Sequence, residues 1–136
     1  FMNTIFNYFF TFIFFMFFSC GLNGNSSINQ MNSDELLDFI EINNAILVDV
    51  RTQDEYNSGY IENSLNIDYL SNDFSENIEK LDKNIPIILY CRSGRRSSMS
   101  ANKLSKLGFK EIYNLDGGIL KWIETGNNVI FNDTIN

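Results

Sequence analysis

The sequence contains no histidine, and this absence removes several large classes of enzyme at once. Ser-His-Asp triads, cysteine–histidine nucleophile pairs and HExxH zinc sites all need an imidazole as base or ligand. The only two cysteines, Cys20 and Cys91, are too few and too far apart for a tetrahedral cysteine-rich zinc site. We therefore expect no metal ion and no other cofactor, and chemistry based on a lone thiol stays open.

Basic residues are also scarce, since 10 Lys and Arg stand against 17 Asp and Glu and give a net charge of -7. Phosphate backbones are bound mainly through neutralisation by Lys and Arg, so we expect no nucleic-acid partner. The length of 136 residues suits one domain behind an N-terminal leader. Such a domain can bury a core without disulfides, which leaves the thiols free for chemistry.

The N-terminal stretch is apolar, and residues 1–18 carry no charge and hold nine of the 13 phenylalanines. This run is close to the minimum of about 20 residues for a spanning helix and also suits the apolar region of a signal peptide. The following Ser19-Cys20-Gly21 resembles the lipobox of bacterial lipoproteins, in which the cysteine is acylated. We expect residues 1–20 to be a signal peptide with Cys20 as the lipidation site, or alternatively an uncleaved membrane anchor. Either interpretation predicts an exported protein at the cell envelope, membrane-bound and facing the periplasm or the exterior.

Residues 21–31 are rich in Asn, Ser and Gly, which predicts a flexible tether. The folded domain is expected to cover residues 32–130, and residues 131–136 are expected to form a tail. Within the domain, Asn32 with Glu35 and Thr52 with Glu55 give capping-box patterns at the start of two helices.

Helices and strands are expected to alternate through the rest of the domain. Apolar, β-branched runs predict strands at residues 45–50, 64–67, 86–91 and 111–115. Helical patterns cover residues 33–42, a short stretch after Thr52, and residues 75–81, 97–107 and 119–125. This alternation predicts an α/β domain with a mostly parallel sheet and right-handed crossovers.

Cys91 ends the most hydrophobic predicted strand and precedes a helix, a position where ligands bind in open parallel sheets. The loop that follows contains glycine, so its N–H groups and the helix N-terminus can converge on one anion. Three of the ten basic residues, Arg92, Arg95 and Arg96, lie in this short stretch. The pattern predicts a nucleophilic thiolate beside an anion site, and the alternative is a buried structural cysteine before a solvated basic turn.

Activating this thiol needs more than the helix. Lowering a cysteine pKa from about 8.5 to about 7 takes roughly 2 kcal/mol, whereas a helix N-terminus usually supplies only about 0.3 to 1 kcal/mol. Direct N–H hydrogen bonds, helped by the arginines, are expected to supply the remainder. We expect the thiol to be both ionised and open to water.

Five groups of residues resemble, in order, the motifs of the rhodanese homology domain. They are Asp49-Val50-Arg51, Glu55-Tyr56, Gly59-Tyr60-Ile61, Cys91-x-x-Gly94-x-Arg96-Ser97, and Leu115-Asp116-Gly117-Gly118 with Trp122 and Gly126. The resemblance implies a five-stranded, mostly parallel sheet flanked by helices on both faces. It also implies a sulfurtransferase that takes sulfane sulfur from thiosulfate or a similar anionic donor and passes it to cyanide, a thiol or a protein acceptor. Tyr60 departs from the family, which commonly has histidine there.

The resemblance implies a role for each matching residue. Cys91 is the nucleophile that carries the persulfide, and the substrate-binding loop comprises Arg92, Ser93, Gly94, Arg95, Arg96 and Ser97. Charged residues beside a buried strand usually form pairs, so Asp49, Arg51 and Glu55 are interpreted as structural supports. Trp122 is expected to lie in the core.

Two other functions stay open at this level. A phosphatase or arsenate reductase of the same fold would also cradle an oxyanion, but such relatives have five residues between cysteine and arginine, and Cys91 and Arg96 are separated by four. A rhodanese module that carries a persulfide without turnover, or binds a partner at the envelope, would keep the same thiol.

Overall fold

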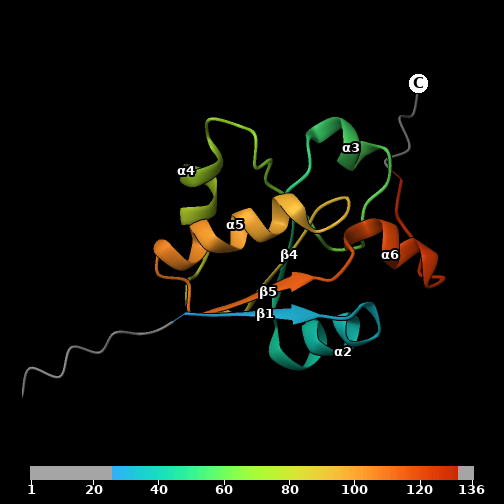
Figure 1. Ribbon diagram of the computed structural model, residues 1–136, viewed down its shortest axis with the longest axis horizontal. Helices are drawn as coiled ribbons and strands as arrows, with labels where there is room; N and C mark the ends of the chain where they lie inside the picture. Colours follow the sequence, from blue (N-terminus) through green and yellow to red (C-terminus); the bar gives the residue numbers. More distant parts are fainter. Residues whose placement is uncertain (1–25, 132–136) are drawn as a thin grey trace, which may run out of the picture.

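The four predicted apolar runs and one polar segment form the strands of a single parallel sheet in the computed structural model, which describes residues 26–131 (Figure 1). The strand order is β1-β5-β4-β2-β3, and every neighbouring pair is parallel. The strands are β1 Ser27–Met31, β2 Ile46–Asp49, β3 Leu65–Asn66, β4 Ile87–Tyr90 and β5 Glu111–Leu115. The prediction of an α/β domain with a five-stranded, mostly parallel sheet is confirmed.

The five predicted helices are present, with small shifts at their ends. They are α2 Ser33–Asn43, α3 Gln53–Asn57, α4 Phe74–Glu79, α5 Arg95–Lys106 and α6 Gly118–Glu124. Side chains from α4 and α5 pack on one face of the sheet, and side chains from α2 and α6 pack on the other. Figure 1 shows α3 and α6 at the end of the molecule toward which the β1 and β5 arrows point. The helices therefore cover both faces, and the carboxyl ends of the strands meet α3 and α6.

Two separate apolar layers result from this packing. Ile87 and Leu89 of β4 face the layer under α5, while Ile88 and Tyr90 face the opposite layer, because side chains alternate along a strand. Trp122 of α6 is 3% exposed in the second layer and donates a hydrogen bond of 2.8 Å to the Asn128 carbonyl. The prediction that Trp122 is a core residue is confirmed.

Strand β1 shows that the predicted tether was wrong for part of its length. Its five residues pair in parallel with β5, from Ser27 opposite Glu111 to Met31 opposite Leu115. In the strand only Met31 is buried, because β1 is an edge strand whose polar side chains stay in solvent. The strand is held by main-chain hydrogen bonds to β5, so neither apolar alternation nor a hydrophobic run marks it in the sequence.

The other boundaries can be compared only in part. Residues 1–20 with Cys20, residues 21–25 of the tether, and residues 132–136 of the tail lie outside the described residues. Phe131 was assigned to the tail but belongs to the folded domain, since its ring lies 3.2 Å from the position of a Cβ added to Gly59. Within residues 26–131, no helix combines the length and the apolar character needed to cross a bilayer.

Only one of the two predicted capping boxes forms. The Thr52 hydroxyl accepts a hydrogen bond of 3.3 Å from the Glu55 N–H, and the Glu55 carboxylate accepts one of 3.1 Å from the Thr52 N–H. Asn32 makes no side-chain hydrogen bond to the start of α2, so the box predicted there was wrong. Glu55 is thus fixed at the start of α3, from which it can reach across to another element.

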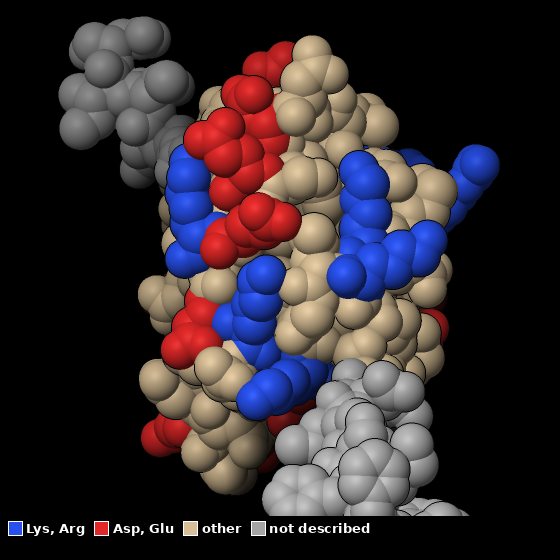
Figure 2. All heavy atoms as spheres, turned by 90° about the vertical axis from the view of Figure 1, so that its left-hand side faces the viewer, with Lys and Arg blue, Asp and Glu red and all other residues tan. Residues whose placement is uncertain are grey.

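Figure 2 shows the face that carries α4 and the C-terminal end of α5, at the amino ends of the strands. Acidic and basic side chains are interspersed there, and neither sign covers the face alone. The exposed Lys80 and Glu76 form an ion pair of 3.3 Å on this side. Basic and acidic side chains thus lie close together on this face. Arg92, Arg95 and Arg96 lie at the other end of the strands and are not part of it.

Candidate active site

Cys91 directly follows β4 at the carboxyl end of the sheet, where the sequence places the candidate nucleophile. The chain turns between Cys91 and Gly94, and Gly94 precedes α5 with φ of 107°. This left-handed value favours glycine, because other residues are strained there. Helix α5 begins at Arg95 rather than at Ser97 as predicted, so Arg95 and Arg96 lie in its first turn. The loop itself is thus only four residues long, from Cys91 to Gly94.

The Cys91 sulfur lies inside a ring of hydrogen-bond donors. The Gly94 N–H donates to Sγ at 3.1 Å, and the Ser97 hydroxyl lies 3.4 Å from Sγ and 3.1 Å from the Gly94 carbonyl. Burial raises the pKa of the Cys91 thiol, but hydrogen bonds from the Ser97 hydroxyl and from the N–H groups of Ser97, Gly94 and Ser93 outweigh burial, and the pKa is lowered. The donors favour the thiolate, which is the nucleophilic form.

The solvent exposure of Cys91 differs from the expectation. Cys91 is 1% exposed, so the thiol is enclosed rather than open to water. The loop curls around the sulfur, and the turn before α6 packs against the Cys91 carbonyl. The sulfur is therefore shielded from bulk solvent.

The arginines also contribute differently from the expectation. Arg96 donates from Nη1 and Nη2 to the two Glu55 carboxylate oxygens, both at 2.7 Å. Burial and the ring of donors are the main influences on the pKa of Cys91, while the charge interaction between Cys91 and Arg96 is one of the smaller causes that raise the pKa of Arg96. Arg92 and Arg95 are exposed to solvent. The hydrogen bonds that lower the pKa of the thiol most therefore come from neutral donors.

The Glu55–Arg96 pair connects α3 to the first turn of α5. The Arg96 guanidinium is the largest influence on Glu55 and lowers its pKa. Partial burial opposes this effect, and hydrogen bonds from the N–H and hydroxyl of Thr52 add to it, so that the pKa of Glu55 is about 2. The pair thus stays charged through the neutral range, and Glu55 is the carboxylate partner of Arg96. A bidentate arginine–carboxylate pair also fixes the relative orientation of the two side chains, so it holds α3 in a defined position against α5.

Asp49 and Arg51 form a second pair, which is buried beneath the site. Arg51 donates to both Asp49 carboxylate oxygens, at 2.6 to 3.0 Å, and also to the Gly59 carbonyl at 2.7 Å. The Tyr90 hydroxyl accepts a hydrogen bond of 3.1 Å from the Ile61 N–H beside this pair. Burial, reinforced by the Asp49 carboxylate, raises the pKa of Tyr90, so its hydroxyl stays neutral. The geometry fits the supporting role predicted for Asp49 and Arg51, which stays a prediction.

The turn before α6 is part of the site, although the sequence analysis did not assign it this role. The Ile119 N–H donates to the Cys91 carbonyl at 2.9 Å, and the Leu120 N–H donates to the Arg92 carbonyl at 3.2 Å. A Cβ on Gly118 would lie 2.5 Å from the Cys91 carbonyl oxygen, so only glycine allows this approach. The paired glycines at 117 and 118 were the available signal, because adjacent glycines often mark a close approach of two backbones.

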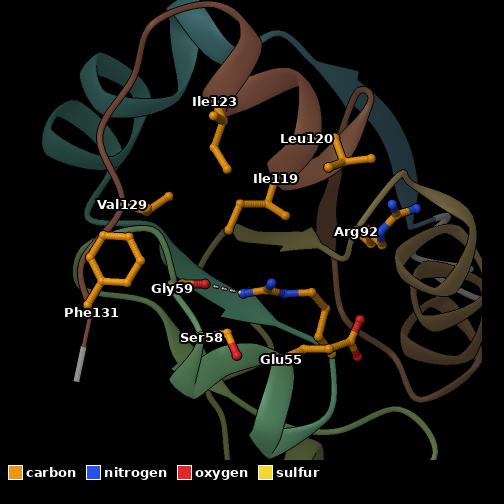
Figure 3. Close-up of a pocket in the computed structure, with 10 residues that line it drawn as sticks. Glu55, Ser58, Gly59, Arg92, Ile119, Leu120, Ile123, Val129 and Phe131 are labelled. Atoms are coloured by element: carbon orange, nitrogen blue, oxygen red, sulfur yellow. Dashed lines mark hydrogen bonds between the residues drawn. The ribbon is translucent and has the colours of Figure 1, made fainter. Parts of the chain in front are cut away.

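A pocket of about 310 Å³ opens beside the loop (Figure 3). Five apolar side chains form most of its wall: Ile119, Leu120, Ile123, Val129 and Phe131. Arg51, Glu55, Ser58, Gly59 and Arg92 complete the lining. Figure 3 shows Arg92 and Phe131 at opposite ends, with Ile119 and Ile123 of α6 pointing into the space between them. Cys91 does not line this pocket, but its neighbour Arg92 does.

The arrangement is suited to nucleophilic chemistry by a thiolate on a small anionic group. Among residues 26–131 there is no cluster of three or more His, Cys, Asp or Glu side chains that could hold a metal ion. The donors around Sγ can also bind a negative charge that develops on an atom attached to the sulfur.

Comparisons with known proteins agree with this description. A model of the family described as Rhodanese-like domain matches residues 32–125. The thiosulfate sulfurtransferase GlpE of Coxiella burnetii is 34% identical over 93 residues, which are 68% of this chain and 85% of that protein. The tRNA uridine(34) hydroxylase of Chlamydia felis is 29% identical over 109 residues, which are 76% of this chain but only 34% of that longer protein. The crystal structure of a rhodanese-related protein from Thermoplasma volcanium superposes with a TM-score of 0.68 at 31% identity, covering 76% of this chain and 99% of that one.

Proposed function

This chain belongs to the rhodanese-like domain family, and we propose that it moves sulfane sulfur from thiosulfate or a similar donor to a thiol or cyanide through a persulfide on Cys91. One observation carries the proposal: the Gly94 N–H and the Ser97 hydroxyl both lie within hydrogen-bond distance of Cys91 Sγ. These contacts favour the thiolate and can also hold the outer sulfur of a persulfide. The similarity to thiosulfate sulfurtransferases supports the same reaction class.

In the first half-reaction, the Cys91 thiolate attacks the outer sulfur of thiosulfate. A new S–S bond forms to Sγ, and the original S–S bond breaks with its electron pair leaving on sulfite. The outer sulfur of the resulting persulfide lies about 2 Å from Sγ. Its negative charge can then be stabilised by N–H donors of the Cys91–Gly94 turn, which already face the thiolate.

In the second half-reaction, a nucleophilic acceptor attacks the outer sulfur. The bond between that sulfur and Sγ breaks, and its electron pair returns to Cys91 as the thiolate. The lowered pKa of the Cys91 thiol makes it a good leaving group. The same hydrogen bonds therefore assist both half-reactions, and the enzyme needs no metal or redox cofactor for either.

Mass spectrometry of the purified chain after thiosulfate treatment tests the proposal. We expect a gain of one sulfur on the peptide that contains Cys91, with release of one sulfite for each persulfide. Cys91→Ala should gain no sulfur, while Cys20→Ala should still gain it. Addition of cyanide should then restore the original mass and yield one thiocyanate for each persulfide, and with thiosulfate in excess thiocyanate should accumulate over many cycles. An unchanged mass would refute the catalytic proposal, and a persulfide that no acceptor removes would indicate a carrier without turnover.

We also propose an exported, membrane-attached location for this activity, based on the apolar residues 1–18 and the following Ser19-Cys20-Gly21. Metabolic labelling with a fatty acid is the direct test. We expect label on the unaltered chain and none on Cys20→Ala. Label that persists in Cys20→Ala would exclude Cys20 as the lipidation site, and a membrane-bound but unlabelled chain would favour an uncleaved membrane anchor.

A further inference from the structure

We infer that Asn114, near the carboxyl end of β5, is a positioning residue for the nucleophile: its buried carboxamide holds the first turn of α5 where the Ser97 hydroxyl reaches Cys91 Sγ. The inference rests on the proposed function and names a residue that acts on the thiolate through α5. Asn114 directly precedes the Leu115-Asp116-Gly117-Gly118 motif and is not part of it.

The Asn114 carboxamide connects β5 to two other elements. Its Nδ2 donates to the Ser98 hydroxyl of α5 and to the side-chain carbonyl of Gln30 in β1, both at 3.1 Å. Asn114 is 4% exposed, and its Nδ2 lies 3.9 Å from the position of a Cβ added to Gly94. The carboxamide therefore lies next to both the turn that follows Cys91 and the first turn of α5.

Three consecutive residues of α5 contact three different parts of the fold. The Arg96 side chain binds α3, the Ser97 hydroxyl lies 3.4 Å from the Cys91 sulfur, and the Ser98 hydroxyl accepts from β5. Side chains of consecutive helical residues point about 100° apart, so α3 and β5 hold the helix from nearly opposite sides. Ser97 lies between these two contacts, and both of them fix the direction of its hydroxyl.

The direction of the Ser97 hydroxyl matters because a second acceptor is close to it. The Gly94 carbonyl lies 3.1 Å from this hydroxyl and also accepts from the Ser98 N–H at 3.0 Å. A small rotation of α5 therefore decides whether Ser97 donates to the sulfur or to the carbonyl. We expect loss of the Asn114 contact to favour the carbonyl, which leaves the thiolate with one donor fewer.

The stability of the fold does not account for a carboxamide at this position. Oδ1 of Asn114 is buried and has no hydrogen-bond partner among residues 26–131. An unpaired buried carbonyl lowers stability, and leucine has nearly the same shape without a polar group. Gln30 is exposed and Ser98 is partly exposed, so both can bond water when the carboxamide is removed. The carboxamide is instead explained by the position that it gives to α5.

Asn114→Leu and Ser98→Ala remove the two ends of this contact in the full chain. The ionisation of Cys91 is followed by thiolate absorbance against pH, relative to Cys91→Ser, and persulfide formation from thiosulfate is timed in the same variants. We expect each variant to form the persulfide about three- to fivefold more slowly at pH 7, because a smaller fraction of the thiol is ionised. The difference should vanish above the pKa of the thiol, where every variant holds the thiolate.

Two further measurements separate positioning from a general structural role. In urea, Asn114→Leu should be at least as stable as wild type, although its thiol ionises at higher pH. The double variant of Asn114→Leu with Ser98→Ala should shift the titration no further than either single variant, because both changes remove the same contact.

Two control variants should keep the wild-type titration of Cys91. Asn102→Leu removes another carboxamide that bonds Ser98, an exposed one that donates to the Ser98 carbonyl at 3.1 Å. Ile112→Val truncates a fully buried side chain of β5 and lowers stability without removing a polar group. None of these variants changes a charge, so the interaction of Cys91 with Arg96 is present in all of them.

The inference is overturned if Asn114→Leu titrates as wild type does, or if its shift and that of Ser98→Ala add in the double variant. It is also overturned if Ile112→Val moves the titration as far, since lost stability would then account for the shift. If Asn114→Leu does not fold, Ser98→Ala decides, because Ser98 is only partly buried. The titrations need no sulfur donor, so failure of thiosulfate to load Cys91 would contradict the proposed function alone.

Discussion

Arg96 and Glu55 are bound to each other through two hydrogen bonds of 2.7 Å, although they are separated by 41 positions in the sequence. Arg96 lies in the first turn of the helix that follows the nucleophile, and Glu55 closes the capping box of α3. An arginine in this first helical turn would be the natural partner of an anionic substrate. Because Glu55 accepts from both Nη1 and Nη2 of Arg96, we expect anion binding to depend mainly on the backbone N–H groups and on the exposed Arg92 and Arg95.

The first prediction concerns Glu55→Gln and its dependence on pH. The pKa of Glu55 is about 2 in the folded protein, below the value of about 4.3 in an unfolded chain. A lowered carboxyl pKa contributes stability that is present above the unfolded value and is lost as the pH falls through the folded value. Because the side chain is 33% exposed, we expect the substitution to reduce the free energy of unfolding by only about 1 kcal/mol at pH 7.

Urea unfolding of the two proteins at several pH values checks this prediction. The difference between wild type and Glu55→Gln should shrink as the pH falls from about 5 toward 2. Glu41→Gln, an exposed change on α2, serves as the control and should show a small difference at every pH. A difference for Glu55→Gln that stays constant down to the lowest pH would contradict the role of its charge.

The second prediction concerns the hydroxyl of Ser97. A serine hydroxyl has one proton, so Ser97 donates either to Cys91 Sγ or to the Gly94 carbonyl, and ionisation of the thiol favours the sulfur. Ser97→Ala should therefore raise the pKa of the Cys91 thiol and slow persulfide formation at pH 7 about three- to tenfold. Thiolate absorbance measured against pH, relative to Cys91→Ser, gives the shift directly.

Ser100→Ala is the matched control for this experiment. Ser100 is also buried on α5, but its hydroxyl donates to the Arg96 carbonyl at 2.8 Å and does not contact the sulfur. The titration of Cys91 should be the same in Ser100→Ala as in wild type. If Ser97→Ala leaves the midpoint unmoved as well, the hydroxyl does not stabilise the thiolate.

The fold could be predicted from the sequence wherever burial leaves a periodic pattern. Strand β5 was predicted with its observed bounds, because apolar and polar residues alternate in EIYNL and the strand is largely buried in the sheet. Strand β1 was missed because four of the five side chains of SINQM are exposed. The strand is fixed by main-chain pairing with β5, and its first residue, Ser27, pairs with Glu111, 84 positions further along the chain. Local sequence cannot reveal an edge strand whose partner supplies its hydrogen bonds.

The place of the candidate site in the fold could be predicted from the sequence, but its contacts could not. Cys91 and Gly94 were predicted to lie together at the end of a buried strand, and the Gly94 N–H does donate to Cys91 Sγ at 3.1 Å. The engagement of Arg96 by Glu55 could not be derived, because it depends on how α3 packs against α5. The enclosure of Cys91 likewise depends on the turn at Gly118, which approaches from a distant part of the chain.

The third prediction compares a buried ion pair with an exposed one. Asp49→Asn leaves the Arg51 guanidinium buried with a neutral partner, since Arg51 is 6% exposed. We expect a loss of about 3 to 5 kcal/mol in the free energy of unfolding. Asp116→Asn breaks the exposed pair with Lys121 and should reduce stability far less, because solvent screens that pair. Equal losses in urea unfolding would show that burial of the Asp49–Arg51 pair does not determine its contribution.

The fourth prediction separates two effects of adding a methyl group to a glycine. Gly118 and Gly108 both have positive φ, 60° and 91°, so alanine is strained at either position by about 1 kcal/mol. At Gly118 the new Cβ would also lie 2.5 Å from the Cys91 carbonyl oxygen, whereas at Gly108 nothing lies within 4 Å. Gly118→Ala should therefore lose about 2 to 4 kcal/mol of stability and load sulfur far more slowly, because the nucleophile turn must shift. Gly108→Ala should lose only the strain and keep the wild-type loading rate. Comparable losses in both variants, measured by urea unfolding and by the rate of sulfite release, would mean that the approach of α6 does not position Cys91.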